Sequence, residues 1–440
     1  MIRIVDHRAA ADLLTRRTAR LQEAEETVRP ILEAVRARGD AALVEYCRKF
    51  DGFTGSTIAV DPETCRSALA RLDRDFLSAV DLAAGNIRDY AGTQLPQGRF
   101  IDYRDGRRLG QIVRPLDTMG AYIPGGRYPL PSTLLMTVIP AQVAGVKRIA
   151  IACPRASDEV LGLAAYLEVP CVFQMGGAHA IAALAYGTET VRKVDRIVGP
   201  GNVYVAAAKK MIAGDTGIDF VAGPTEIVII AAEGKPAVIA ADMLAQAEHD
   251  VDASAILLTT SRSFAESVAA EIDRQLAGLP TASVAGEAIA RNGAIVLFED
   301  LGEAAEFANQ LAPEHLALHD AALLHTIRNA GSIFLGTSSP EAAGDYASGP
   351  NHVLPTSGAA RLRGGLSAAD FVKVISVQEL SGEALSRLAR SVTTLARAEG
   401  LEAHARSVEM RVHQSGVGSV RSGSVGVWSQ DFPTPGLNDS

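Results

Sequence analysis

Short apolar runs rich in β-branched residues alternate with helix-length segments through the middle of the chain. This alternation is typical of βαβ units, in which each helix returns the chain so that successive strands pair in parallel. The runs are RIAIACP (148–154), VPCVFQMGG (169–177), RIVGPGN (196–202), TEIVIIAAE (225–233), ASAILLTTS (253–261), GAIVLFED (293–300) and GSIFLG (331–336). They predict an α/β protein with mainly parallel sheet, and the region is long enough for two such layers.

Helical patterns flank the alternating region. Residues 8–50, 62–95 and 378–411 have apolar positions at three- and four-residue spacing, as amphipathic helices do. Residues 108–126 differ, because they contain β-branched residues and a Gly-rich turn. Residues 413–440 are rich in Gly and Ser and have no period, so we expect a mobile tail there.

Charge and hydropathy exclude two classes of partner. The formal net charge is −9, and no cluster of Lys and Arg is long enough to follow a phosphate backbone. We therefore expect no nucleic-acid partner. The N-terminal MIRIVDHRAA has no apolar signal core, and runs such as residues 134–146 are too short to span a bilayer. These features predict a cytoplasmic protein with no membrane partner.

The cysteines form no metal or redox motif. None of Cys47, Cys65, Cys153 and Cys171 belongs to a C-x-x-C pair. Cys153 and Cys171 lie in apolar runs, where small buried hydrophobic residues are expected. Any bound metal would therefore have nitrogen and oxygen ligands.

An apolar helix that begins near residue 235 ends in the polar stretch MLAQAEHDVD (243–252). Gln246 and His249 are three residues apart, so on a helix they share a face with Cβ atoms roughly 5–6 Å apart. A carbonyl oxygen and an imidazole nitrogen could then converge on one point. The alternative is a helix end that simply becomes solvated.

Further polar residues lie beside apolar runs. Glu314 and His315 are adjacent, and a carboxylate beside an imidazole can divide proton transfer and water activation between them. Asp345 lies in a Gly-rich segment and offers oxygen ligands. Glu399 and His404 lie in a helical pattern that Gly400 interrupts, which could aim both at one point. Taken one at a time, each is also compatible with an ordinary loop or surface residue.

Three Gly-rich loops suggest a phosphorylated cofactor. They are AYIPGGRYPLPST (121–133), MGGAHAIAALAYG (175–187) and GPGNVYVAAAKKMI (199–212), with Asn202 as a helix N-cap. Backbone N–H groups at such helix starts can face an anion. The full G-x-G-x-x-G pattern is missing, so tight strand-to-helix packing turns explain the loops equally well.

Together these motifs resemble the histidinol dehydrogenase family from about Ile2 to about Arg411. The strings that carry the resemblance are GAYIPGG, GGAHAIAALAYGTETVRKVDRIVGPGN, AGPTEIVIIA, DMLAQAEH, APEHLAL, GDYASGPNHVLPT and AEGLEAHARSVEMR, in that order. The resemblance implies a zinc-dependent enzyme with one zinc ion per subunit. It would oxidise L-histidinol through L-histidinal to L-histidine, the last steps of histidine biosynthesis, with two successive reductions of NAD.

The resemblance also implies a fold. This is an aldehyde-dehydrogenase-like arrangement of two incomplete Rossmann-like, parallel-sheet domains with small helical terminal segments, assembled as a homodimer. The expected ranges are an N-terminal helical segment 1–20, a first α/β domain 21–121 and 225–366, an inserted second domain 122–224, a C-terminal segment 367–412 that exchanges between protomers, and the tail 413–440.

Site residues follow from the same match. The expected zinc ligands are Gln246, His249, Asp345 and His404, and the expected catalytic pair is Glu314 and His315. The expected substrate contacts are Thr225, Gln246, His249, His315, Asp345, Glu399 and His404. The expected NAD contacts are Tyr122, His179 and Asn202.

Two departures and two alternatives remain. The family string has Gln where this chain has His179, and Phe-His where it has Tyr90-Ala91. An imidazole can still donate one hydrogen bond, but its reach differs.

A paralogous NAD-dependent dehydrogenase of another polar alcohol, such as a sulfonated diol, is the nearest alternative function. A non-catalytic binding protein is the other, and the presence of both Glu314 and His315 disfavours it.

Overall fold

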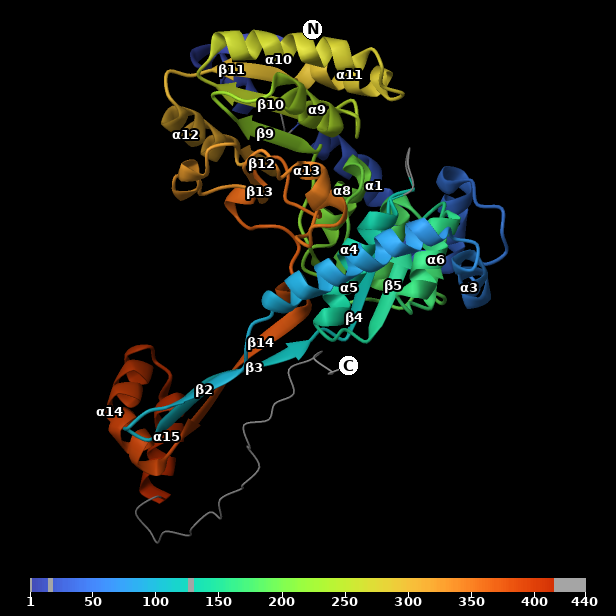
Figure 1. Cartoon of the computed structure of the whole chain (residues 1–440). Coiled ribbons are helices and arrows are strands. Elements are labelled where there is room, and N and C mark those ends of the chain that lie inside the picture. The colour runs from blue at the N-terminus through green and yellow to red at the C-terminus, as the bar shows by residue number, and fades with distance from the viewer. Residues whose placement is uncertain (1, 15–18, 126–129, 415–440) are drawn as a thin grey trace. The chain divides into compact units, whose positions relative to one another are not determined.

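The computed structural model of the chain describes residues 2–14, 19–125 and 130–414. It divides into two units (Figure 1). The first contains the chain up to Gln94 and Leu116–Phe371, and the second contains Leu95–Pro115 and the chain from Val372 onward. Among the described residues, no helix combines the length and apolar character that crossing a bilayer requires.

A six-stranded parallel sheet forms one half of the first unit. Its strand order is β1-β11-β10-β9-β12-β13. The strands are β1 (Arg3–Asp6), β11 (Ala294–Leu297), β10 (Ser254–Thr259), β9 (Glu226–Ile230), β12 (His315–Leu318) and β13 (Ser332–Leu335). The central strand β9 is buried at every position, as expected where helices cover both faces of a parallel sheet.

Helices cover both faces of this sheet. One core is shared with α9 (Pro236–Ala247), α10 (Arg262–Leu276) and α11 (Ala282–Asn292). The other is shared with α12 (Leu301–Leu311) and η2 (Ala11–Leu14). Ser261 and Asp300 cap α10 and α12, each accepting a hydrogen bond from the first turn. The short helix α13 (Glu341–Tyr346) follows β13.

A five-stranded parallel sheet forms the other half of the first unit, in the order β6-β5-β4-β7-β8. The strands are β6 (Cys171–Phe173), β5 (Arg148–Ala152), β4 (Thr118–Tyr122), β7 (Arg196–Val198) and β8 (Gly217–Ile218). The helices of this half are α1 (Ala19–Arg38), α2 (Asp40–Tyr46), α3 (Pro62–Leu69), α4 (Arg74–Thr93), α5 (Pro131–Val143), α6 (Asp158–Tyr166), α7 (Gly177–Tyr186) and α8 (Val203–Ile212), with the π-turn η3 (Cys47–Asp51) after α2.

The second unit is built on an antiparallel sheet in the order β14-β3-β2. It comprises β14 (Val372–Leu380), β3 (Arg107–Pro115) and β2 (Arg99–Asp102), followed by α14 (Gly382–Ala398) and α15 (Glu402–Gln414). The two helices pack against each other.

The expected α/β fold with two parallel sheets is confirmed, since all seven predicted apolar runs contain strands. The structure differs from the expected ranges in detail. Residues 1–20 supply β1 of the six-stranded sheet, and α1 packs with α7 and α8 on the five-stranded sheet. Residues 378–380 extend β14 instead of beginning a helix, and Cys171 is exposed on the edge strand β6. Most of the expected tail, residues 415–440, lies outside the described residues.

Candidate active site

The candidate catalytic residues gather at the amino ends of two neighbouring strands. Thr225 precedes β9, Glu314 precedes β12 and His315 begins β12, which pairs with β9 through His315 and Ile227. The helix α9 runs back from the carboxyl end of β9, so its last turn returns Gln246 to the same edge. The site therefore lies opposite the carboxyl edge where open α/β sheets usually bind ligands.

Glu314 is held by two donors in a buried position. Its Oε2 accepts hydrogen bonds from the Thr225 hydroxyl at 2.5 Å and from the Glu226 backbone N–H at 2.9 Å. Its side chain is 9% exposed. The carboxyl group is thus fixed in orientation and largely withdrawn from water.

The tautomer of neutral His315 is set by the backbone. Its Nδ1 lies 3.2 Å from the Glu226 carbonyl oxygen, which can only accept, so Nδ1 must carry a proton. Its Nε2 is buried and has no hydrogen-bond partner among the described residues. That atom lies 3.7 Å from Asp345 Oδ1. In the neutral ring, Nε2 is therefore an unused proton acceptor inside the site.

Glu341 joins this cluster, although the sequence analysis did not select it. It begins α13 and lies four residues before Asp345, so the two carboxyl groups share one face of a single helical turn. Ligand atoms of His249, Glu341 and Asp345 all lie within 4.8 Å of one another, a geometry that could hold a metal ion. The His249 imidazole is 3.9 Å from Asp345 Oδ2. The i, i+4 spacing in EAAGDY was the signal that could have identified Glu341.

The amide of Gln246 lies between Glu341 and Thr225, the residue that donates a hydrogen bond to Glu314. With its nitrogen donating to Thr225 Oγ1 at 2.8 Å, its oxygen faces Glu341. The opposite orientation gives the nitrogen Glu341 Oε1 as acceptor at 2.6 Å, but places it 3.2 Å from His315 Nδ1. Since Nδ1 of His315 already carries a proton, the amide oxygen of Gln246 is a better neighbour for it than the amide nitrogen. The amide oxygen of Gln246 then faces the cluster, next to the Glu341 carboxyl group.

The pKa values agree with this arrangement. Burial raises the pKa of Glu314 to about 7 and that of Glu341 to about 8. Burial would lower the pKa of His315, but the carboxyl groups of Glu341, Glu314 and Asp345 raise it to about 10. Burial opposes ionisation of Asp345, yet the neighbouring imidazoles bring its pKa below its usual value. The buried carboxyl groups of Glu314 and Glu341 and the partly buried one of Asp345 lie beside imidazoles, and a divalent cation would offset their negative charge.

The remaining expected ligands belong to the second unit. Glu399 caps the end of α14, and His404 lies on the exposed surface of α15. The structure defines the second unit by itself, so it does not place His404 or Glu399 relative to Gln246, His249 and Asp345. In the first unit, His352 Nδ1 contacts the Asp345 carbonyl oxygen at 2.7 Å and fixes the backbone at that ligand.

The expected cofactor contacts all lie in the half with the five-stranded sheet. Tyr122 ends β4, and its hydroxyl accepts a hydrogen bond from Gly177 N–H at 3.1 Å. Asn202 caps α8 by accepting from Tyr204 and Val205 N–H, both at 3.1 Å. Gly199 has a φ of +115°, and a Cβ there would lie 2.1 Å from the Tyr122 carbonyl oxygen. A side chain at position 199 would therefore separate Tyr122 from the loop that carries Asn202.

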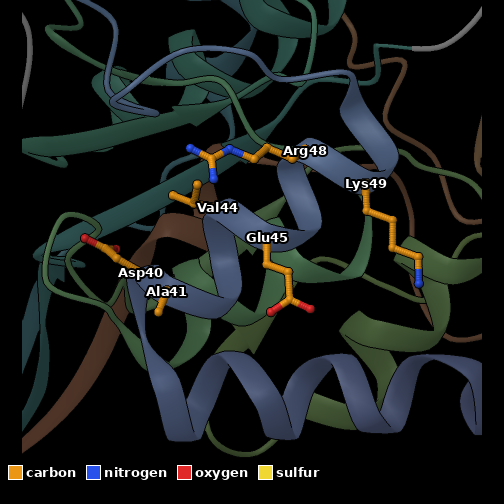
Figure 2. Close-up of a pocket in the computed structure, with 6 residues that line it drawn as sticks. All are labelled: Asp40, Ala41, Val44, Glu45, Arg48 and Lys49. Carbon is orange, nitrogen blue, oxygen red and sulfur yellow. The ribbon is translucent and has the colours of Figure 1, made fainter.

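A hollow on the surface of the same half is shown in Figure 2. It has a volume of about 700 Å³ and lies beside α2 and η3, which supply all of its lining residues. These are Asp40, Ala41, Val44, Glu45, Arg48 and Lys49. The residues expected to bind substrate, metal or NAD do not line it.

Comparison with known proteins identifies the family. A sequence model described as "Histidinol dehydrogenase" matches residues 14–412. The chain belongs to the histidinol dehydrogenase family. It is accordingly an oxidoreductase. The histidinol dehydrogenase of Geobacillus kaustophilus is 49% identical over 402 residues, covering 89% of this chain and 95% of that protein.

Two further relatives agree with this assignment. The histidinol dehydrogenase of Thermus thermophilus is also 49% identical, and the match covers 88% of this chain and 94% of that protein. The crystal structure of histidinol dehydrogenase from Elizabethkingia anophelis superposes with a TM-score of 0.90 at 34% identity. That match covers 94% of this chain and 99% of the other, so the family likeness extends through nearly the whole chain.

Proposed function

We propose that this member of the histidinol dehydrogenase family is a zinc-dependent L-histidinol dehydrogenase. It would oxidise L-histidinol to L-histidinal and then to L-histidine, reducing one NAD in each oxidation. The observation that carries the proposal is the convergence of Gln246, His249 and Asp345 beside the buried pair Glu314 and His315. Metal-type donors and proton-transfer groups thus occupy the same edge of one sheet.

The donor set fits a zinc ion. Gln246 and Asp345 would supply oxygen ligands and His249 a nitrogen ligand, with His404 as the fourth. Nitrogen and oxygen donors are usual for a catalytic zinc site, which keeps a position open for substrate. The bound ion would orient the imidazole and amine of the substrate and stabilise negative charge on the reacting oxygen. Glu341 lies close enough to the same donors to balance the charge of the ion.

The two protein groups divide the proton transfers between the oxidations. In the first, Nε2 of His315 takes the hydroxyl proton of the carbinol while the carbinol carbon loses a hydride to NAD. In the second, Glu314 takes a proton from the water that attacks the aldehyde carbon, and the resulting hydrate loses the second hydride. A pKa near 7 suits Glu314 to this task, because a base is most effective near the working pH.

Substrate and NAD contacts complete the proposal. Thr225 would orient Glu314 and contact the substrate, and Glu399 would hold the cationic amine of histidinol. Tyr122, His179 and Asn202 would contact NAD. Tyr122 and Asn202 are supported by agreement with the family pattern and by their proximity through the loop at Gly199. His179 is supported by its position alone, because the family has Gln there.

The yield of NADH tests this function against its nearest alternative. With limiting L-histidinol, we expect two NADH per molecule of substrate, measured by absorbance, and L-histidine as the product. A panel of other polar alcohols, including a sulfonated diol, serves as the control. Turnover of another alcohol without turnover of histidinol would refute the proposal in favour of a paralogous dehydrogenase.

We also propose a homodimer. Apolar side chains that a monomer would leave in water are exposed on the second unit. They are Ile101, Val374, Ile375, Leu380, Leu395, Leu401 and Met410. A partner chain that covers them would also allow His404 of the partner subunit to complete the metal site.

Dilution tests the assembly. We expect specific activity to fall as the protein is diluted below its dimer dissociation constant, with sedimentation measured at the same concentrations. Replacing Val374 and Ile375 by Asp should give a folded monomer with little activity, because burying those charges in an interface is costly. Full activity from a monomer would contradict the shared site.

A further inference from the structure

We propose that Asp51 and His179 form a buried pair that holds the Gly176–Gly177 turn and thereby positions the NAD contacts around it. Asp51 ends η3, and His179 lies in the first turn of α7. The inference rests on the proposed function for the identity of the ligand. His179 is then a positioning residue, together with Asp51, which is not among the residues predicted from the sequence.

Asp51 supplies the N-terminal acceptor that α7 lacks in its own sequence. The N-cap residue of α7 is Gly176, which has no side chain to accept a hydrogen bond. Asp51 Oδ2 instead accepts from Gly176 N–H at 2.9 Å. A carboxylate at this position also interacts favourably with the positive end of the helix dipole. A Cβ on Gly176 would lie 2.7 Å from Pro154 Cβ and 2.9 Å from Asp51 Oδ1, so the close packing at this turn requires glycine.

His179 locks Asp51 in place. Its Nε2 lies 2.8 Å from the same Asp51 Oδ2, and the two side chains are 1% and 8% exposed. Because a carboxylate only accepts, Nε2 must be the protonated nitrogen. The imidazole also packs near the rings of Tyr46 and Phe50, with centroids 6.0 and 6.1 Å away. Both hydrogen bonding and packing therefore fix the orientation of His179.

The turn is consequently preformed by protein groups. Gly176 N–H donates to Asp51 and Gly177 N–H donates to the Tyr122 hydroxyl. These two amides are already used, so they are not phosphate donors. Their function is to tie Tyr122, an expected NAD contact, to the start of α7. Loss of the Asp51–His179 pair would loosen this arrangement and reduce NAD affinity without touching the proton-transfer groups.

A metal ion is the rival interpretation, because ligand atoms of Cys47, Asp51 and His179 lie within 4.8 Å of one another. The contacts are explained without one. Asp51 accepts hydrogen bonds from His179 and Gly176, and the Cys47 thiol lies close to it. Burial and the neighbouring Asp51 raise the pKa of that thiol to about 12, so it remains neutral. Asp51 and His179 therefore already have each other as partners.

The variants His179→Ala, His179→Gln and Asp51→Asn test the pair in the full-length, zinc-loaded enzyme. Each is measured for NADH affinity by fluorescence titration and for KM and kcat with NAD. We expect His179→Ala to weaken NADH binding and raise the KM for NAD by about tenfold, a larger factor than any fall in kcat, as for loss of a charge-assisted hydrogen bond. Glutamine can donate to Asp51, so His179→Gln should rescue affinity. Asp51→Asn is nearly isosteric and provides a test if the alanine variant fails to fold.

Asn309→Ala is the matched control, because Asn309 is also buried and accepts from the N–H groups of Arg328 and Asn329 far along the chain from this turn. It should lower the melting temperature without changing NADH affinity. The same loss of NADH affinity in Asn309→Ala, or no loss in His179→Ala and Asp51→Asn, would overturn this inference but leave the proposed function standing. Wild-type enzyme that binds no NADH would overturn the proposed function as well. A second bound metal, lost in Cys47→Ala, would overturn the hydrogen-bonded pair.

Discussion

Glu314→Gln should lower the rate of histidinal oxidation by about 10²–10⁴-fold while leaving the protein folded, since general acid–base groups contribute that much. Glutamine has nearly the same shape as glutamate, and its amide oxygen can still accept the hydrogen bonds from the Thr225 hydroxyl and the Glu226 N–H that hold the carboxyl group of Glu314. It cannot take a proton from water. The loss should therefore be greater with L-histidinal than in the conversion of histidinol to histidinal.

His315→Asn should give the opposite pattern. It removes Nε2, the atom that would accept the carbinol proton, so the first oxidation should lose about 10²–10⁴-fold. Stopped-flow measurement of NADH formation from each substrate separates the two steps. His325→Asn and Glu303→Gln are matched controls, because neither residue lies in the cluster. Equal losses for both variants with both substrates would contradict the division of roles.

Most strands of the two parallel sheets could be predicted from the sequence, because buried parallel strands are continuous apolar runs. The strands in RIAIACP and ASAILLTTS are largely buried on both faces. Each is therefore a short run of apolar residues, and such a run predicts a strand without knowledge of distant residues. HLAL (315–318) is equally buried, but it has only four residues and begins within the polar pair Glu314–His315, so its pattern does not distinguish a strand from a loop. β14 and β3 pair over a separation of more than two hundred residues, and no local pattern encodes that register.

The site residues likewise divide into those that could be predicted from the sequence and those that could not. Helical spacing predicts that Gln246 and His249 share a face, and the family resemblance implies that both are ligands. The structure places Gln246 beside Glu341 and His249 beside Asp345. Glu341 was missed because a Gly-rich segment favours a loop, whereas residues 341–346 form a helix. Asp51 could not be found from sequence, since its partner His179 lies 128 residues away. Buried polar pairs of this kind depend on tertiary contacts alone.

Removal of zinc should abolish activity and destabilise the protein. Without a cation, the carboxyl groups of Glu314, Glu341 and Asp345 remain close together, and they raise the pKa of His315 to about 10. At pH 7.5 its imidazole would then be protonated and unable to accept the carbinol proton. A divalent cation at His249 and Asp345 would offset these charges and lower that pKa. Chelation would therefore remove both the substrate anchor and the general base.

The chelated enzyme should regain activity with added Zn²⁺ but not with Mg²⁺, which prefers oxygen ligands in octahedral geometry. Metal content is measured before and after chelation, alongside the rate of NADH formation and the melting temperature. Zinc at 1,000 times its dissociation constant would stabilise the fold by about 4 kcal/mol. His249→Ala and Asp345→Asn should lower zinc content, whereas His325→Ala should not. Full activity in protein that retains no metal would exclude the metal-dependent mechanism, and zinc content unchanged in both ligand variants would place the ion elsewhere.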